Sequence, residues 1–169
     1  RKDGHHPIIF MQCGPIRYKV EAKHAAKDRP FRHIMIPRIN DSISLLHESK
    51  LSIQEIYKVL SEDEIRNNMI VSDVIEAVNA GKSPLILTER TDHLKRIAEL
   101  LDNKIKNVVI LRGGMSKKQR LEVAQRLDDI DDNEERVIVA SGRYIGEGFD
   151  DARLDTLFLA LPISWRGTL

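Results

Sequence analysis

The sequence of 169 residues predicts an α/β fold, in which helices cover both faces of a parallel sheet. Beyond residue 61, segments with helical periodicity alternate with four short apolar runs, at 84–88, 108–111, 136–140 and 156–160. The runs are apolar at most positions, which is typical of strands buried on both faces. They are joined through helices, as parallel strands usually are. We therefore expect four adjacent parallel strands.

The first helix of this alternating region is expected to begin at Ser61 and to end at Gly81. Ser61 and Glu64 have the spacing of a capping box, in which the hydroxyl and the carboxylate bind the first free backbone N–H groups. Gly81 is a typical helix stop, because glycine adopts the left-handed backbone conformation at little cost. The residues expected on the buried face are Ile65, Met69, Val74, Ile75 and Val78.

Two more helices are expected after the first two strands. Thr91 is predicted to cap the first of them, and the residues expected to face inward are Leu94, Ile97, Ala98 and Leu101. Ser116 and Gln119 form another capping-box pattern. The helix that begins there is expected to bury Leu121, Ala124 and Leu127. The acidic run at 128–135 fits a solvated loop, because it lacks the central glycine and spaced final glutamate of a calcium-binding loop.

The first part of the chain has a different character. Two short apolar runs, at 8–11 and 32–36, resemble strands, and a linker is expected near 37–42. Residues 1–38 contain nine Lys/Arg and three Asp/Glu, a net charge of +6 in a chain whose total is +1. A basic segment fits either a nucleic-acid contact or a solvated surface, and the charge counts leave both open. Because the chain begins with Arg1 and stops abruptly at Leu169, we expect a fragment of a longer protein.

Composition excludes several other classes of protein. Hydrophobic residues make up 41% of the chain and charged residues 31%, as in an ordinary globular protein. No apolar run approaches the ~20 residues that span a bilayer, and no signal-peptide pattern is present, so we expect no membrane partner and a cytoplasmic location. The single cysteine, Cys13, excludes an internal disulfide and is expected to be a small buried hydrophobe. The six histidines lack ligand spacing, so we expect no metal site.

Three segments follow predicted strands, at 88–91, 112–116 and 140–150. In an open parallel sheet, ligands bind beyond the carboxyl ends of the strands. Each segment combines small residues, which let a phosphate approach the backbone, with an arginine that can bind it through two hydrogen bonds. Three such segments at one edge indicate a polyanionic ligand.

Simpler interpretations exist for the individual segments. Gly113 and Gly114 fit an ordinary turn between a strand and a capped helix, and Arg120 fits an exposed helical position. The glycines at 146 and 148 fit a bend, which leaves Asp150 unexplained. Residues 81–83 are not a phosphate-binding P-loop, because the required earlier glycine is missing and they follow a helix rather than a strand. Residues 146–151 also lack the third glycine of a dinucleotide-binding motif.

The order of these segments resembles the C-terminal motor domain of superfamily-two helicases. The nearest branch contains DEAD/DEAH-type helicases and the motor subunits of type III restriction enzymes. Residues 84–90 resemble the fourth motif of the family, 111–120 resemble the following glycine-glycine and Gln-Arg motif, and 137–150 resemble the fifth motif. Residues 1–4 and 14–18 resemble the stretch that follows the third motif, at the end of the first motor domain.

The resemblance implies a RecA-like parallel sheet with helices on both faces, preceded by the tail of a first RecA-like domain. Residues 1–38 would be the end of the first motor domain and a linker. Residues 39–169 would be the second RecA-like domain, truncated at its C-terminus. The nucleic-acid-binding residues that it implies are Thr88, Arg90, Gly113, Gly114, Gln119, Arg120, Ser141 and Arg143. Gly148 and Asp150 would face ATP, and Glu147, where many relatives have arginine, is given no catalytic role.

The family pattern is incomplete in this chain. The sequence contains no P-loop, no acidic box for magnesium and no sixth motif with its arginine finger, all of which phosphoryl transfer requires. We therefore expect part of an ATP-dependent helicase or translocase that is inactive alone, with no catalytic residue in this chain. ATP and Mg²⁺ would bind in the longer parent, whose partners would be its own first motor domain and DNA or RNA, with DNA favoured. The alternatives are an unrelated α/β nucleotide-binding enzyme and a non-catalytic nucleic-acid-binding module with a motor-like fold.

Overall fold

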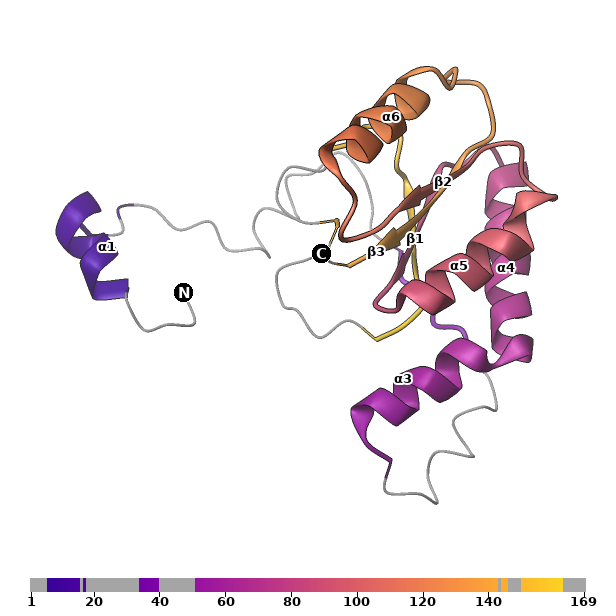
Figure 1. Cartoon of the computed structure of the whole chain (residues 1–169), viewed down its shortest axis with the longest axis horizontal. Coiled ribbons are helices and arrows are strands. Elements are labelled where there is room, and N and C mark those ends of the chain that lie inside the picture. Colours follow the sequence, from indigo (N-terminus) through magenta and orange to yellow (C-terminus); the bar gives the residue numbers. More distant parts are fainter. Residues whose placement is uncertain are drawn as a thin grey trace. The chain divides into compact units, whose positions relative to one another are not determined.

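The computed structural model of the chain describes residues 6–15, 17, 34–39, 51–142, 144–145 and 150–162 (Figure 1). The chain divides into two compact units, Arg1–Ile39 and Asn40–Leu169. The assignment of residues 1–38 to the end of a first motor domain stays a prediction. Among the described residues, no helix is long and apolar enough to cross a membrane.

In the first unit, residues His6–Cys13 form helix α1. The strand expected at 8–11 is therefore wrong. Pro7 fits the first turn of a helix, where a backbone N–H is not needed, and the N–H of Gly14 closes the last turn by donating to the carbonyl of Phe10 at 2.9 Å. Residues 34–36 of the second expected strand have no regular structure. Cys13 is exposed, so its expected burial is also wrong.

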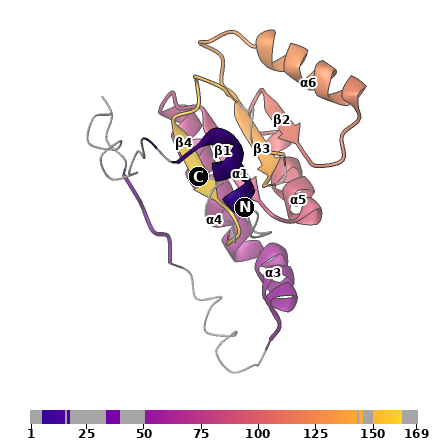
Figure 2. The ribbon, with the colours of Figure 1, turned by 90° about the vertical axis from the view of Figure 1, so that its left-hand side faces the viewer.

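The second unit contains a four-stranded sheet. The strands are β1 (Pro84–Thr88), β2 (Val108–Leu111), β3 (Val137–Ser141) and β4 (Thr156–Leu159). They are arranged in the order β2-β3-β1-β4, and every neighbouring pair is parallel. Figure 2 shows the same order, with β4 on the left and β2 on the right. The expected parallel sheet is confirmed.

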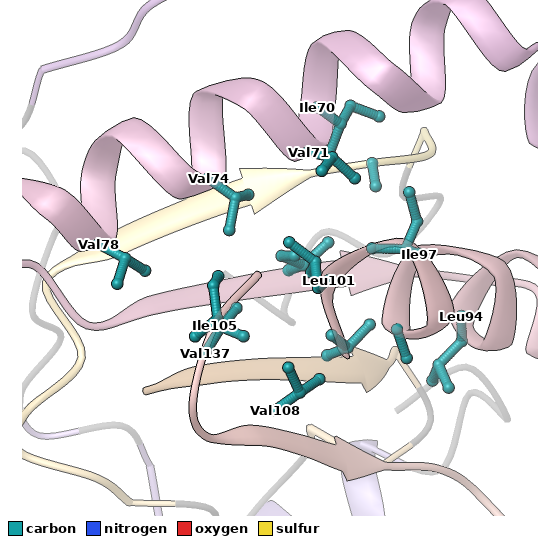
Figure 3. Packing of buried hydrophobic residues seen from close by; sticks show 14 residues of the cluster. Ile70, Val71, Val74, Val78, Leu94, Ile97, Leu101, Ile105, Val108 and Val137 are labelled. Atoms are coloured by element: carbon teal, nitrogen blue, oxygen red, sulfur yellow. The ribbon is translucent and has the colours of Figure 1, made fainter. Parts of the chain in front are cut away.

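Helices lie on both faces of this sheet (Figure 1). Helices α4 (Glu64–Asn79) and α5 (Thr91–Asp102) pack on one face and α6 (Lys117–Asp128) packs on the other, while α3 (Ile53–Glu62) packs against α4 and α5. Alternate residues of each strand point to opposite faces, so that Ile86 packs in one buried cluster with α4 and α5, and Leu85 and Leu87 pack in the other. Figure 3 shows the first cluster, in which Val74 of α4 and Leu101 of α5 are fully buried.

The first part of α4 differs from expectation. Ser61 is a buried residue of α3, and its hydroxyl donates to the carbonyl of Lys58 at 2.8 Å. The N-cap of α4 is Asp63, whose carboxylate accepts from the N–H of Arg66. The capping-box interpretation of Ser61 is therefore wrong, and the capping box actually lies at the start of α3, between Ser52 and Glu55.

The face of α4 that packs on the core also differs from expectation. Ile65 is 80% exposed, while Ile75 is only partly buried. The residues of α4 that are buried in the first cluster are Ile70, Val71, Val74 and Val78. Gly81 ends the helix as expected, at a φ of 76°, where other residues would be strained.

Two expectations about the later helices are also corrected. Arg90, not Thr91, is the N-cap of α5, and no side chain caps that end. The inward residues expected on α5 are buried. Helix α6 has the expected capping box at Ser116 and Gln119 but no fully buried residue. Leu121 is 60% exposed and Ala124 is exposed, while Val123 and Leu127 are the residues that pack on the sheet.

Candidate nucleic-acid interface

The carboxyl ends of β1, β2 and β3 meet at one edge of the sheet. Thr88 and Ser141 are directly paired in the parallel register, and the N–H of Gly142 donates to the carbonyl of Thr88 at 3.0 Å. The N–H of Gly113 donates to the hydroxyl of Ser141 at 2.9 Å. The structure therefore brings together Thr88, Gly113 and Ser141 from three segments that are distant in the sequence.

The loop after β2 is the exposed part of this edge. Gly113 and Gly114 are exposed, and Gly114 has a φ of 79°, which favours glycine over any other residue. The turn leads into α6, whose N-cap is Ser116. Free backbone N–H groups at the beginning of a helix form a ready anion-binding site. The turn interpretation and the ligand interpretation of the glycine pair are thus compatible.

Three cations lie in or beside this loop; Arg112 is the arginine of the expected segment, whereas Lys117 and Lys118 had not been expected from the motifs. Arg112, Lys117 and Lys118 are all exposed, and the first turn of α6 contains no acidic residue. Positive charge at a helix N-terminus is unfavourable, because that end of the helix dipole is itself positive. Lysines in place of the usual acidic residues in the first turn of a predicted helix are the sequence signal that could have identified these positions. An anionic ligand at the loop would remove the repulsion.

Gln119 and Arg120 lie in the same first turns of α6 and are both exposed. The side-chain carbonyl of Gln119 accepts from the N–H of Ser116 at 3.0 Å, so its first role is to cap the helix. The Nε of Arg120 donates to the carbonyl of Met115 at 3.2 Å, which holds the guanidinium beside the loop. Both positions stay predicted contacts.

The fourth-motif residues are less accessible than expected. Thr88 is completely buried, and its Oγ1 lies 2.9 Å from Nδ1 of His93. A direct contact between this hydroxyl and nucleic acid would require that hydrogen bond to open, so the contact stays a prediction. Arg90 is 30% exposed and lies 3.7 Å from Asp92. Its Nε is buried and lacks a partner among the described residues.

His93 was not expected to belong to this region. Its Nε2 lies 2.8 Å from the side-chain oxygen of Asn67, and the ring is 1% exposed. Burial lowers the pKa of His93 to about 4, and the nearby positive charges of Arg66, Arg96 and Arg90 act in the same direction. The imidazole is therefore neutral at neutral pH.

The residues expected to face ATP lie partly outside the described structure. Gly148 and Glu147 are not among the described residues, and neither is Arg143 of the predicted nucleic-acid set. Asp150 is exposed and lines a cavity of about 450 Å³ on the α6 face of the sheet. The same cavity is lined by Arg136, Asp151 and Arg153.

These three residues organise the turn that precedes β4. Arg136 is 3% exposed and forms an ion pair with Asp151 at 2.9 Å. Asp151 also accepts from the backbone N–H of Arg153 at 3.0 Å. The guanidinium of Arg153 donates to four carbonyls of residues 130–134, so it closes the acidic loop with its own positive charge. Within the described parts of the chain, no group of three His, Cys, Asp or Glu residues could hold a metal ion.

Comparison with known proteins identifies the architecture. No protein-family model matches the chain. It is 33% identical over 104 residues to the transcript termination protein A18 of fowlpox virus (strain NVSL), a match that covers 60% of the chain and 22% of that protein. The chain also superimposes on T4 UvsW with a TM-score of 0.56 at 19% identity, covering 70% of the chain and 24% of UvsW.

The second solved structure is the C-terminal domain of the SWI2/SNF2 ATPase of Sulfolobus solfataricus. It has a TM-score of 0.51 at 14% identity, and the match covers 74% of the chain and 58% of that domain. The chain thus spans about a quarter or less of the full relatives that it matches, and just over half of the isolated domain. At these identities the solved structures establish the fold.

Proposed function

We propose that this chain, which has the fold of the C-terminal RecA-like domain of superfamily-two helicases, supplies half of the nucleic-acid track of an ATP-dependent helicase or translocase. The observation that carries the proposal is the hydrogen bond from Gly113 to Ser141. It joins the glycine loop of one strand to the fifth-motif hydroxyl of the next, at an edge lined by cations.

The chemistry of this edge suits a phosphate backbone. Exposed glycines leave room for a phosphate, and the first turn of α6 offers backbone N–H groups. Arg112, Lys117 and Arg120 would supply positive charge beside them. Such contacts recognise phosphate rather than base, so we expect binding without sequence preference. DNA is the favoured track, and RNA is the alternative.

ATP and Mg²⁺ would be held mainly by another domain of the longer protein. In that assembly Gly148 would leave space beside the nucleotide, and Asp150 would accept hydrogen bonds from the ribose hydroxyls. The exposure of Asp150 supports such a role. Closure of the two domains around ATP and their reopening after hydrolysis would move the strand along the track.

A non-catalytic module with the same fold is the second candidate, because this chain contains no P-loop. Both candidate functions include nucleic-acid binding at this edge, but only the motor includes ATP hydrolysis by the longer protein. Coupled ATP turnover by the longer protein supports the motor, whereas nucleic-acid binding without turnover supports the module.

The track is tested by the salt dependence of binding. The 169-residue chain is titrated into fluorescein-labelled single-stranded dT20, and anisotropy is followed at several salt concentrations. Neutralising two or three phosphates gives a slope of about −1.5 to −2 for log affinity against log salt, from roughly −0.7 per phosphate. Arg120→Ala and Arg143→Ala should each flatten this slope by somewhat less than one.

Arg126→Ala is the matched control for Arg120→Ala. Arg126 is an exposed arginine of the same helix, but it lies in the last turn, away from the glycine loop. Its replacement should leave the slope close to that of the unmodified chain. A slope near zero, or equal losses from Arg120→Ala and Arg126→Ala, would argue against a track at this edge.

A further inference from the structure

A buried chain of hydrogen bonds leads from the helices to the carboxyl edge of the sheet. The side-chain nitrogen of Asn67 donates to the carbonyl of Ser61 at 3.0 Å. Its oxygen lies 2.8 Å from Nε2 of His93, and Nδ1 of His93 lies 2.9 Å from Oγ1 of Thr88. The chain therefore links α3, α4, α5 and the last residue of β1.

The donors and acceptors of this chain have one consistent arrangement. Because Asn67 uses its amide nitrogen to donate to Ser61, it presents its oxygen to His93. Nε2 of His93 must then carry the proton, and Nδ1 is the acceptor. The hydroxyl of Thr88 donates to Nδ1, which orients the whole side chain.

Burying these polar side chains lowers stability unless each of them is hydrogen-bonded, so packing alone would not favour them. Asn67 and Thr88 are completely buried, and His93 is 1% exposed. An unpaired polar group in such a place destabilises a protein, whereas apolar residues of the same shape would pack there without that risk. Thr88 ends a strand whose other residues are apolar, so valine would be the simplest choice on packing grounds.

Thr88 is the point at which the buried chain reaches the candidate site. Its carbonyl accepts from the N–H of Gly142, and its register partner Ser141 accepts from the N–H of Gly113. Thr88 thus holds the N–H of Gly142 directly, and it is paired with Ser141, the residue that holds the N–H of Gly113. If Thr88 is held in place, the loops proposed to face phosphate are held in place at its end of the sheet.

We propose that Asn67 and His93 are positioning residues, which hold Thr88 and through it align Gly113, Ser141 and Gly142 for the phosphate backbone. The proposal rests on the function proposed above for this edge. Neither Asn67 nor His93 touches the ligand. The depressed pKa of His93 supports the proposal, because a neutral ring keeps Nδ1 free to accept.

The test measures alignment and binding separately. Amide hydrogen exchange, observed by NMR on the 169-residue chain, reports on the N–H groups of Gly113 and Gly142. Binding of labelled dT20 is measured on the same samples. His93→Leu fills the space but cannot accept from Thr88, and Thr88→Val removes the hydroxyl while preserving the shape. Both should reduce protection of the two glycine amides by about fivefold or more, the effect of losing one ordinary hydrogen bond.

Two controls separate positioning from general destabilisation. Leu101→Ala weakens the core from the same helix but lies outside the hydrogen-bonded chain, so it should lower protection across the sheet without singling out the glycines. Thr88→Ser keeps the hydroxyl that donates to His93 and should retain the protection of both glycine amides that Thr88→Val loses. If His93→Leu fails to fold, glycine protection is compared between Thr88→Val, which lacks the hydroxyl, and Thr88→Ser, which keeps it.

Each outcome has a distinct meaning. Selective loss of glycine protection with a loss of dT20 affinity of about fivefold or more supports the proposal. Unchanged protection in folded His93→Leu and Thr88→Val overturns it, and so does lost protection with unchanged affinity. If the unmodified chain itself does not bind dT20 but protection is lost selectively, the proposed function fails while the alignment by His93 stands.

Discussion

The hydroxyl of Ser141 accepts a hydrogen bond from the backbone N–H of Gly113 at a distance of 2.9 Å. The two residues are 28 positions apart: Gly113 lies in the loop after β2, and Ser141 is the last residue of the neighbouring strand β3. Ser141 is 7% exposed, whereas Gly113 is exposed. The contact therefore anchors the exposed glycine loop to the end of a buried strand, and leaves the remaining groups of the loop accessible to a ligand.

Ser141→Ala should loosen this loop without unfolding the sheet. The lost hydrogen bond should lower the free energy of unfolding by about 0.5–1.5 kcal/mol, because the N–H of Gly113 can turn to water instead. Urea denaturation measures the loss, and nucleic-acid affinity should fall with it. Ser72→Ala, at an exposed position of α4, is the control and should not destabilise. Equal stability of the two variants would mean that the contact contributes nothing.

Lys117→Glu should change stability and binding in opposite directions. A negative charge in the first turn of α6 interacts favourably with the helix dipole, so the free energy of unfolding should rise by about 0.3–1 kcal/mol. Affinity for dT20 should fall, because the charge faces the proposed phosphate site. Arg126→Glu makes the same charge change in the last turn, where it should destabilise the helix and affect binding less. A gain in affinity for Lys117→Glu would contradict the placement of the track.

The stability of the chain should depend on pH between about 4 and 6.5 because of His93. Burial lowers the pKa of this residue to about 4 in the folded state, against 6.5 for an ordinary histidine. The unfolded state binds the proton more readily in this range, so stability should be full above pH 6.5 and fall as the pH decreases toward 4. The loss should be about 3 kcal/mol, from 1.36 kcal/mol per unit of pKa.

Urea midpoints measured from pH 4 to pH 8 provide the data for this prediction. His93→Gln should flatten the dependence over the same range, which separates His93 from the five other histidines of the sequence. An unchanged pH profile in His93→Gln would show that another group titrates.

The buried ion pair of Arg136 should be the most sensitive electrostatic contact in the described structure. Asp151→Ala leaves the guanidinium of Arg136 buried without a counter-charge, which should cost about 3–5 kcal/mol. Asp132→Ala removes a carboxylate that is 89% exposed and 3.6 Å from Arg153, so its cost should stay within about 0.5 kcal/mol. Urea denaturation compares the two. Similar losses would indicate that burial does not matter here.

The 169-residue chain should not hydrolyse ATP, because its sequence lacks the phosphate cradle and the residues for magnesium. Phosphate release is measured with and without single-stranded nucleic acid. In the longer protein, Asp150→Ala should impair coupled turnover and leave the fold intact, because loop residues at a cleft contribute little to core packing. Turnover by the chain alone at about 1 per second or faster would contradict the proposed division of labour.

Local patterns predicted the sheet better than the helices. The four strands were found from continuous apolar runs, although only β1 and β3 are buried at every residue, while alternate residues of β4 are exposed. The start of α4 was misplaced, since Ser61 and Asp63 both offer capping side chains and the sequence does not say which N–H groups are free. The burial of Leu121 was overestimated because helical periodicity does not show how closely α6 approaches the sheet.

The sequence by itself determined the parallel α/β architecture and the order of the loops that follow its strands, since both follow from runs of adjacent residues. Only the tertiary structure decided that Thr88 is buried against His93, that Gly113 binds Ser141, and that Arg136 pairs with Asp151. The partners in these contacts are 5, 28 and 15 residues apart. Such pairings depend on how separate elements pack, and a local pattern contains no information about the distance between two side chains in the folded protein.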